Sequence, residues 1–364
     1  MASRVAAGPL FTPGDHVVGV TDADADADTE HADAAASEAF QALGDEARLS
    51  TLVTLLDRDD PVPFSDLRAA TGVEPSARFA YHLRQLTGRY VEGGDDGYRL
   101  TYAGRKVARA VAAGTYTDSV AFEADLDADC PHCGATALAA SAADNVVEVA
   151  CGDCGRPVLS LPFPPRGYRD RAPEDVPAAF DRHHRSRLAL MRDGVCPECG
   201  GRVETAVVAA EASSDPDDTA DAGRAVAAFR CRTCGHGVRT PVTLSLLEHP
   251  VVVAFHHDHG TGVRDRPLWN VGDEWRETVV SRDPVAVVVS VRLDGELLEL
   301  YVDDAARVVD HRRRPADTDD TRDDEGETSE GTPAEDEDSA AEPETASTDS
   351  TRPSDDESAA SPAA

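Results

Sequence analysis

The apolar residues between positions 37 and 114 recur with the period of amphipathic helices. A short first helix is expected around Phe40 and Leu43, ending at Gly44. Asp45 can cap a second helix, because an aspartate side chain satisfies a free backbone N–H there. Four aliphatic residues within that helix recur with the 3.6-residue helical period: Leu49, Leu52, Val53 and Leu56. Each helix is therefore predicted to turn an apolar stripe toward a common core.

A helix-turn-helix pattern comes next. Ser65 is expected to cap a third helix, which ends at Gly72, and a fourth helix is predicted from residue 76 to about residue 87. The fourth helix has an apolar face made by Phe79, Leu83 and Leu86. Its opposite face carries side chains suited to base and groove contacts in a DNA major groove, namely Arg78, Tyr81, Arg84 and Gln85. An ordinary amphipathic helix with a solvated front fits the same pattern.

Two β-prone runs around a Gly/Asp turn, residues 89–92 and 97–101, predict a hairpin after the fourth helix. A last helix is expected over residues 103–113, closed by Gly114. Three arginines at the hairpin and its borders are candidates for phosphate contacts: Arg89, Arg99 and Arg105. Three helices, a hairpin and a further helix together predict a winged helix-turn-helix.

Three sequence blocks in this segment resemble archaeal, and specifically haloarchaeal, ArsR-type winged-helix regulators. They are residues 43–48 (LGDEAR), 81–86 (YHLRQL) and 97–104 (GYRLTYAG). The resemblance covers residues 37–114 and implies a DNA-binding transcriptional regulator, often a homodimer, with the fourth helix in the major groove. Metal-sensing members carry cysteines in the helix-turn-helix, and residues 65–70 contain none. Metal-responsive derepression through that site is therefore not expected. A winged helix used as a protein–protein module is the alternative.

All eight cysteines fall in four CxxC pairs, which predicts metal binding. The pairs are Cys130/Cys133, Cys151/Cys154, Cys196/Cys199 and Cys231/Cys234. Four thiolates around one ion favour zinc, and the spacing allows a strand to go out and return, as in a zinc ribbon. We predict two structural zinc ions bound by neighbouring pairs. A cross-braced pairing and redox-active CxxC motifs are the alternatives.

Between the two ribbons, residues 162–165 are expected to be an extended spacer, and residues 173–193 a helix. Its predicted apolar positions are Phe180, Leu188 and Leu190, and its predicted exposed positions are Arg182, Arg185, Arg187 and Arg192. His183 and His184 are interpreted as part of a solvated helix face, with metal ligation as the alternative.

The last third of the chain predicts a small α+β unit. Pro250 suits the first turn of a helix ending near Gly260, although the valines after it also suit a strand. The histidines near the end of that helix are interpreted as polar residues placed where the helix dipole favours cations, with a further metal site as the alternative: His256, His257 and His259. Trp269 and Trp275 are expected to anchor the following fold. A β-hairpin is predicted over residues 285–302 around Asp294-Gly295.

The charge distribution modifies this picture. The 364-residue chain has 69 acidic and 35 basic residues and a net charge of −34. Such acidity keeps a protein soluble in concentrated salt, which indicates a halophilic archaeal cytoplasm. Residues 76–112 nevertheless carry seven basic and three acidic residues, a local charge of +4. No apolar run approaches the roughly 18 residues of a membrane span, and no signal peptide is evident, so we expect a cytoplasmic protein without a membrane partner.

The expected fold class is α+β and multidomain, with disordered acidic termini. The predicted order is a disordered arm (1–36), a winged helix-turn-helix (37–114), zinc ribbon 1 (115–160, starting with an acidic connector), a linker and helix (161–193), zinc ribbon 2 (194–242), an α+β segment (243–314) and a disordered tail (315–364). The predicted function is sequence-specific transcriptional regulation through double-stranded DNA. A zinc-ribbon adaptor of the transcription machinery is the alternative. No phosphate loop, nucleophile elbow or HExxH motif is present, so no enzymatic activity is expected.

Overall fold

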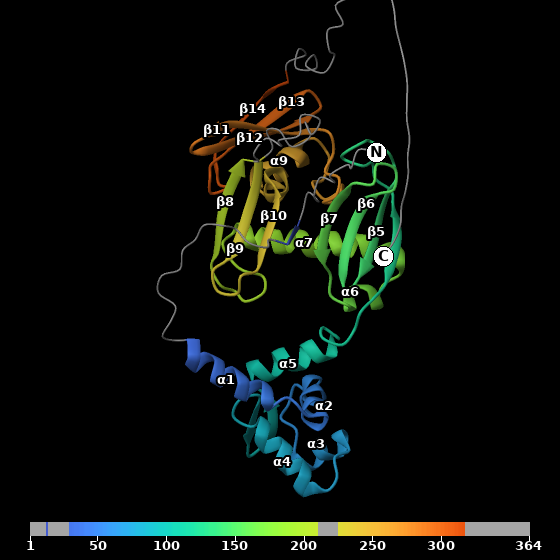
Figure 1. The fold of residues 1–364 in the computed structure, drawn as a ribbon, viewed down its shortest axis with the longest axis vertical. Helices are drawn as coiled ribbons and strands as arrows, with labels where there is room; N and C mark the ends of the chain where they lie inside the picture. Colours follow the sequence, from blue (N-terminus) through green and yellow to red (C-terminus); the bar gives the residue numbers. More distant parts are fainter. Residues whose placement is uncertain (1–11, 14–28, 210–224, 317–364) are drawn as a thin grey trace, which may run out of the picture. The chain divides into compact units, whose positions relative to one another are not determined.

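The computed structural model describes residues 12–13, 29–209 and 225–316. These residues form an α+β protein with several antiparallel sheets, shown in Figure 1. Residues 210–224, most of the N-terminal arm and the tail from 317 onward lie outside the described residues.

The first folded segment is mainly helical and has a hydrophobic core of its own. Its helices are α1 (Thr29–Gln41), α2 (Glu46–Leu56), α3 (Phe64–Thr71), α4 (Ser76–Leu86) and α5 (Tyr102–Ala112), and its hairpin consists of β2 (Val91–Gly94) and β3 (Gly97–Leu100). The core contains Leu52, Leu67, Phe79, Leu83, Leu86, Val91 and Leu100, all buried. The apolar face predicted for α4 is therefore confirmed.

Local signals in this segment act partly as expected. Asp45 caps α2 by accepting a hydrogen bond from the Ala47 backbone N–H at 2.9 Å. Gly72 ends α3 with a φ of 66°, a left-handed conformation that favours glycine. The cap predicted at Ser65 is wrong, because α3 begins one residue earlier and Pro63 holds the N-cap position with its ring-restricted φ. The start of order predicted near residue 37 is also too late.

Phe40 does not join the core, contrary to the prediction for the first helix. Its side chain is 73 % exposed at the end of α1. The helix is held at this end by a polar contact instead, since the Tyr90 hydroxyl donates to the backbone oxygen of Ala39 at 2.9 Å. Leu43, the other apolar residue predicted there, is half-buried against that core.

The first cysteine-bearing sheet has four antiparallel strands in the order β4-β5-β6-β7. Their bounds are β4 (Phe122–Leu126), β5 (Leu138–Ala143), β6 (Val146–Cys151) and β7 (Pro157–Pro162). β4 lies inside the acidic connector predicted at the start of the 115–160 segment. The prediction of a connector is therefore wrong for residues 122–126. The alternation along β4 buries Leu126 while Glu123 and Asp125 face solvent, so the acidic residues mark one face of a strand.

The second cysteine-bearing sheet has the order β1-β10-β9-β8. The bounds are β1 (Thr12–Pro13), β8 (Val203–Ala209), β9 (Ala225–Cys231) and β10 (Gly237–Pro241). β1 comes from the predicted disordered arm and pairs antiparallel with β10. The prediction of a wholly disordered arm is therefore wrong at these two residues. Phe229 on β9 is buried in the core shared by this sheet and the elements around it.

The segment between these sheets contains α6 (Arg166–Arg169), the 3-10 turn η1 (Pro173–Asp175) and α7 (Val176–Arg192). The predicted helix is present, but α7 begins at Val176, three residues later than predicted, because residues 173–175 form the 3-10 turn. The predicted exposure of several of its residues is wrong. Arg185 is only 3 % exposed because it pairs with buried Asp181, whereas Leu190 is 45 % exposed. His184 is buried rather than solvated, since its ring packs 4.6 Å from that of Phe180.

Burial of His184 predicts a pH-dependent stability. Its Nε2 atom lies 3.0 Å from the backbone oxygen of Pro162, and burial lowers the pKa of the ring to about 3. The unfolded chain takes up this proton near pH 6.5, so stabilisation is complete above that pH and falls as the pH drops toward the folded value. We expect the unfolding free energy to fall by about 1.4 kcal/mol per pH unit below pH 6.5, relative to His184→Gln. Urea unfolding of both proteins between pH 7 and 5 measures the difference; parallel pH profiles would contradict it.

The last described segment packs helices on a meandering sheet. Its elements are α8 (Val242–Leu246), α9 (Pro250–Asp258), β11 (Trp275–Arg282), β12 (Val285–Leu293), β13 (Glu296–Val302) and β14 (Val308–Pro315). The helix starting at Pro250 and the hairpin at Asp294-Gly295 are confirmed, and both turn residues have positive φ, 46° and 80°. β14 extends the sheet into residues that the sequence did not predict as a strand.

Candidate metal centres and nucleic-acid interface

The first four-thiol cluster lies where β6 and the loops of the first sheet meet. Cys130 and Cys133 come from the loop between β4 and β5, and Cys151 and Cys154 from the end of β6 and the turn after it. The Sγ atoms of Cys130 and Cys154 lie 3.9 Å apart, and those of Cys133 and Cys151 lie 3.7 Å apart. The neighbouring pairs thus converge, as the default pairing predicted.

The second cluster repeats this arrangement around β9. The Sγ atoms of Cys196 and Cys234 are separated by 3.6 Å, and those of Cys199 and Cys231 by 3.5 Å. Arg187 on α7 contacts this cluster's loops through Glu198, and its Nη2 lies 3.3 Å from Nε2 of His236. The helix therefore fixes the second centre through side chains that the sequence pattern alone did not identify.

The spacing of the thiols fits a tetrahedral metal ion. All four Sγ atoms of each cluster lie within 4.8 Å of one another. A Zn–S bond of about 2.3 Å in a tetrahedron places sulfurs about 3.8 Å apart, close to the observed separations. A disulfide needs an S–S distance of about 2.05 Å, so none of these pairs is oxidised in the structure. Two metal ions can therefore be held, one per cluster.

The turns around the cysteines favour the thiolate form at one cysteine of each cluster. In each turn a glycine after the second cysteine has positive φ; Gly155, for example, has φ of 70° and donates to the Cys151 backbone oxygen at 2.9 Å. The backbone N–H of Cys154 lowers the pKa of Cys151 to about 7. In the same way, the backbone N–H of Cys234 lowers the pKa of Cys231 to about 6. A neighbouring thiol in each cluster, Cys133 in the first and Cys234 in the second, has its pKa raised to about 12, because burial and hydrogen bonds from the other thiols favour its protonated form. One cysteine per cluster therefore ionises well before that neighbour.

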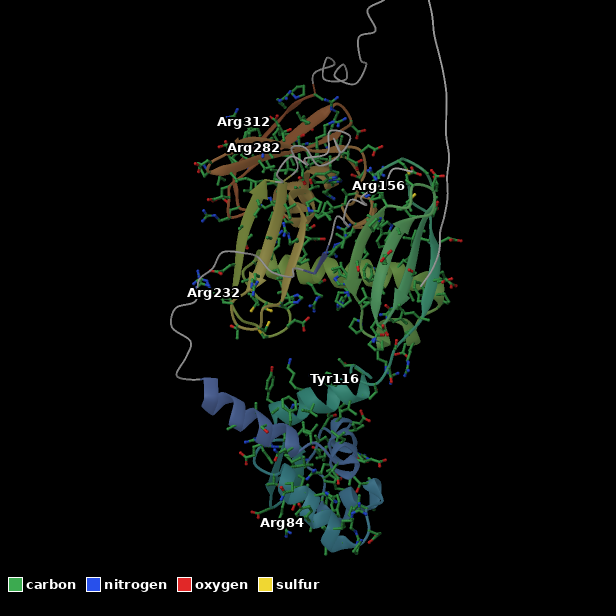
Figure 2. All side chains as sticks on the ribbon, viewed as in Figure 1. Arg84, Tyr116, Arg156, Arg232, Arg282 and Arg312 are labelled. Carbon is green, nitrogen blue, oxygen red and sulfur yellow. The ribbon has the colours of Figure 1, made fainter. Side chains whose placement is uncertain are left out.

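The predicted DNA-reading residues share the exposed face of α4. Arg78, Tyr81, Arg84 and Gln85 are all exposed, with Tyr81 at 49 %, and Figure 2 shows Arg84 pointing away from the helix. Their side chains have no hydrogen bond or ion pair within the described part of the chain. They are available to an external partner, on a helix whose other face is fixed by Phe79.

The three arginines predicted to contact phosphates are less uniform. Arg99 on β3 donates from Nε to Glu92 on β2 at 2.8 Å, and Arg89 lies 3.7 Å from Glu38. Arg105 is exposed on α5 without an ion pair among the described residues. The structure therefore places all three at the hairpin and its borders, and gives two of them an acidic partner within the chain.

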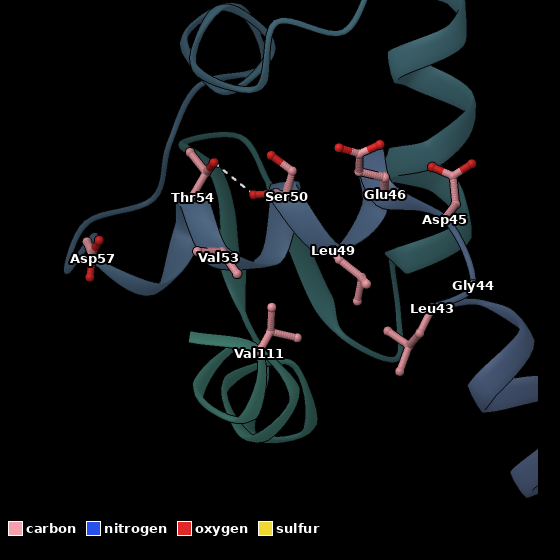
Figure 3. Close-up of a pocket in the computed structure, with 10 residues that line it drawn as sticks. All are labelled: Leu43, Gly44, Asp45, Glu46, Leu49, Ser50, Val53, Thr54, Asp57 and Val111. Atoms are coloured by element: carbon pink, nitrogen blue, oxygen red, sulfur yellow. Dashed lines mark hydrogen bonds between the residues drawn. The ribbon is translucent and has the colours of Figure 1, made fainter. Parts of the chain in front are cut away.

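A groove of about 780 Å³ lies beside α2 on the same segment and has a different character (Figure 3). Its apolar floor includes Leu49, Val53 and Val111. Asp45, Glu46 and Asp57 add carboxylates to its lining. Carboxylates repel phosphates, so this groove is not part of the candidate nucleic-acid interface.

The histidines of α9 do not form a further metal site. Among the described residues, the groups of three or more side chains that could hold a metal are the two cysteine clusters. His256 is buried at 5 % exposure and its ring stacks 5.8 Å from that of Trp275. Burial lowers the pKa of His256, so the interpretation as a cation at the helix end is wrong for this residue. His259 instead lies 3.2 Å from Glu296.

These observations define a class of protein: an α+β chain with a helical, hairpin-bearing N-terminal segment and two sheets that each end in a four-thiol centre. Residues 127–308, half of the chain, match the family described as Domain of unknown function (DUF7351), and the chain belongs to that family. Residues 36–111 match Domain of unknown function (DUF7347). No curated protein matches the chain. No solved structure matches it either. None of the helices in the described ranges is long and apolar enough to cross a membrane.

Proposed function

We propose that this protein is a sequence-specific DNA-binding transcriptional regulator without enzymatic activity. Its N-terminal segment acts as an ArsR-type winged helix-turn-helix, with α3 and α4 as the helix-turn-helix and the β2–β3 hairpin as the wing. The observation that carries the proposal is the exposed α4 face, whose arginine, tyrosine and glutamine side chains have no hydrogen bond or ion pair within the described residues. Arginine pairs with guanine and glutamine with adenine in the major groove.

The positive charge of residues 76–112 also supports the proposal. Residues 76–112 are positively charged within a strongly acidic chain, and α4 and the hairpin both belong to this stretch. Phosphate contacts would come from Arg105 first, since Arg89 and Arg99 must exchange Glu38 and Glu92 for phosphate oxygens. A homodimer would place two such helices on successive half-sites of one operator.

The two four-thiol centres are proposed to hold structural zinc in a cytoplasmic protein. Four soft thiolates at tetrahedral spacing favour zinc over harder ions. A site with four protein ligands leaves no open coordination position, so the ions stabilise the sheets and do not perform catalysis.

Replacing Arg84 by alanine tests the base-reading role of α4. A bidentate contact to guanine is worth about 1–3 kcal/mol of discrimination, so operator affinity is expected to fall by roughly 5-fold to 150-fold. Binding to random duplex is expected to fall much less, because a base contact carries sequence information and a phosphate contact does not. Operators selected from a random duplex library, followed by fluorescence anisotropy titration, provide both affinities.

The matched control is Arg182→Ala, which removes an exposed arginine on α7. Its affinity for operator and random duplex should equal that of the original protein. An equal loss on both duplexes in the Arg84 variant would reassign this residue to a phosphate contact. Failure of the selection to enrich any sequence would contradict the proposed function itself.

A protein adaptor of the transcription machinery is the second candidate, favoured by one surface feature. Leu190 at the end of α7 is 45 % exposed and Val195 is 42 % exposed, and the Val195 backbone N–H donates to the Leu190 oxygen at 2.9 Å. These adjacent apolar side chains lie beside the second four-thiol centre. In that case binding of a transcription protein would be lost in Leu190→Ser while DNA selection yields no motif.

A further inference from the structure

The sheet formed by β11, β12, β13 and β14 has two chemically different faces. Its inner face buries Val289 and Leu300 against the core to which Phe255 of α9 belongs. Arg313 on β14 also turns inward, with its guanidinium carbon 4.9 Å from the centre of the Phe255 ring and a hydrogen bond to Asp258. The residues between these inward positions point outward, and they are exposed or half-buried with the exception of Leu297.

Strand register places arginines in rows across the outer face. In one row, Arg276 of β11 lies opposite Ser290, which lies opposite Glu299, which lies opposite Arg312 of β14. In the next row, Arg292 of β12 lies opposite Leu297, which lies opposite Arg314. Thr278, Val288, Tyr301 and Asp310 make the third row. The face therefore has four arginines and two acidic residues in a chain of net charge −34.

Two of these arginines are available to an external anion. Arg276 is exposed and has no hydrogen bond or ion pair within the ranges that the structure describes. Arg312 is exposed as well, with its guanidinium carbon 5.3 Å from the centre of the Tyr301 ring, which fixes the side chain without neutralising it (Figure 2). Arg314, in contrast, lies 3.4 Å from Glu299, which satisfies that carboxylate within the sheet.

We propose that this outer face binds the phosphate backbone of duplex DNA as a second contact surface of the protein. Neighbouring strands lie about 4.8 Å apart, so Arg276 and Arg312, three strands apart, are separated by about 14 Å. That distance is close to the roughly 12 Å width of the major groove, so the two guanidiniums can contact phosphates on its two sides. The three rows carry four arginines against two acidic residues, so the charge of the face is complementary to phosphate. The inference rests on the proposed DNA-binding function.

The experiment uses the full chain and four proteins: the original sequence, Arg276→Gln/Arg312→Gln, Arg84→Gln, and the charge-matched control Arg171→Gln/Arg182→Gln. Affinities for a random 40-base-pair duplex, for one strand of it and for the selected operator are measured across a series of KCl concentrations. Each lost phosphate contact lowers the salt slope by about 0.9 on B-DNA. We expect the sheet variant to lose about two from the slope on every duplex, and on the order of tenfold in affinity at 0.2 M KCl.

The outcomes separate this inference from the proposed function. A sheet variant that matches the control on duplex, while Arg84→Gln loses operator binding, overturns the second surface and leaves the regulator intact. A loss confined to the single strand also overturns it, in favour of a single-strand platform. A loss in the sheet variant without any effect of Arg84→Gln supports the sheet surface and contradicts base reading by α4. Absence of DNA binding by the original protein overturns both. Circular dichroism and metal content confirm that each variant is folded.

Discussion

Replacing Cys231 by serine is expected to reduce bound metal from two ions to one and to unfold the second cysteine-bearing sheet. Cys231 is 1 % exposed at the end of β9, where its sulfur lies 3.5 Å from that of Cys199. Its thiol has a lowered pKa, whereas a serine hydroxyl stays protonated and is a poor ligand for a soft site. In small zinc domains the metal contributes about 10–16 kcal/mol of apparent folding energy, so removing one ligand has a large effect.

Elemental analysis and thermal unfolding measure this effect, with two comparison variants. Cys151→Ser removes the corresponding ligand of the first centre and should also leave one ion, while destabilising the first sheet. Thr233 lies between the ligands Cys231 and Cys234, and its side chain is not itself a ligand. The Thr233→Ala variant should therefore keep both ions. Retention of two ions per chain in both cysteine variants would contradict the two four-thiol centres.

The second large effect is expected at Asp181 on α7. Its carboxylate accepts from Nε of Arg185 at 3.0 Å and from the Leu268 backbone N–H at 2.8 Å, and both acidic and basic side chains are buried. Arg185 also donates from Nη2 to the Arg266 backbone oxygen at 2.6 Å. Asp181→Ala removes the hydrogen-bonded carboxylate and leaves Glu248, 3.8 Å from Nη1, as the remaining charged partner of the buried guanidinium. We therefore expect a cost of about 3 kcal/mol, at the low end of the range for breaking a buried ion pair. Urea unfolding of the metal-loaded protein measures the loss.

Two variants test whether the cost comes from the unpaired charge. Asp181→Ala/Arg185→Met removes both charges and should recover much of the stability, because an apolar pair of similar volume can replace a buried ion pair. Asp193→Ala breaks the pair with half-buried Arg192, in which the carboxylate is 61 % exposed, and should cost about 1 kcal/mol. A double variant no more stable than Asp181→Ala would show that the loss comes from packing or backbone contacts instead.

Local patterns predicted much of the fold. The periodic apolar residues of α4, the Asp45 cap, the Gly72 stop and the Asp294-Gly295 turn each depend on neighbours within a few positions, and the structure confirms them. The cysteine spacing likewise predicted two four-thiol clusters from neighbouring pairs. Metal identity and DNA reading stay predictions.

The wrong predictions concern residues whose burial or pairing depends on a partner far away in the sequence. Arg185 reads as a solvated helix position, yet a loop more than 80 residues later supplies the carbonyl oxygen that satisfies it. His184 is buried because Pro162, at the end of β7, lies against its ring nitrogen. Strand β14 contains three consecutive arginines, so its sequence lacks the alternation of apolar and polar residues that would have predicted a strand paired with β13. Such pairings depend on tertiary contacts that one-dimensional periodicity does not encode.

The most direct test of the central claim is genome-wide occupancy of the tagged full-length protein in its native cell, beside the Arg84→Ala variant at equal abundance. The account predicts discrete peaks that share a sequence motif, and loss of most peaks in the variant while both proteins retain two metal ions. Absence of enrichment over an untagged strain, or peaks without a shared motif that persist in the variant, would contradict a regulator that reads DNA through α4.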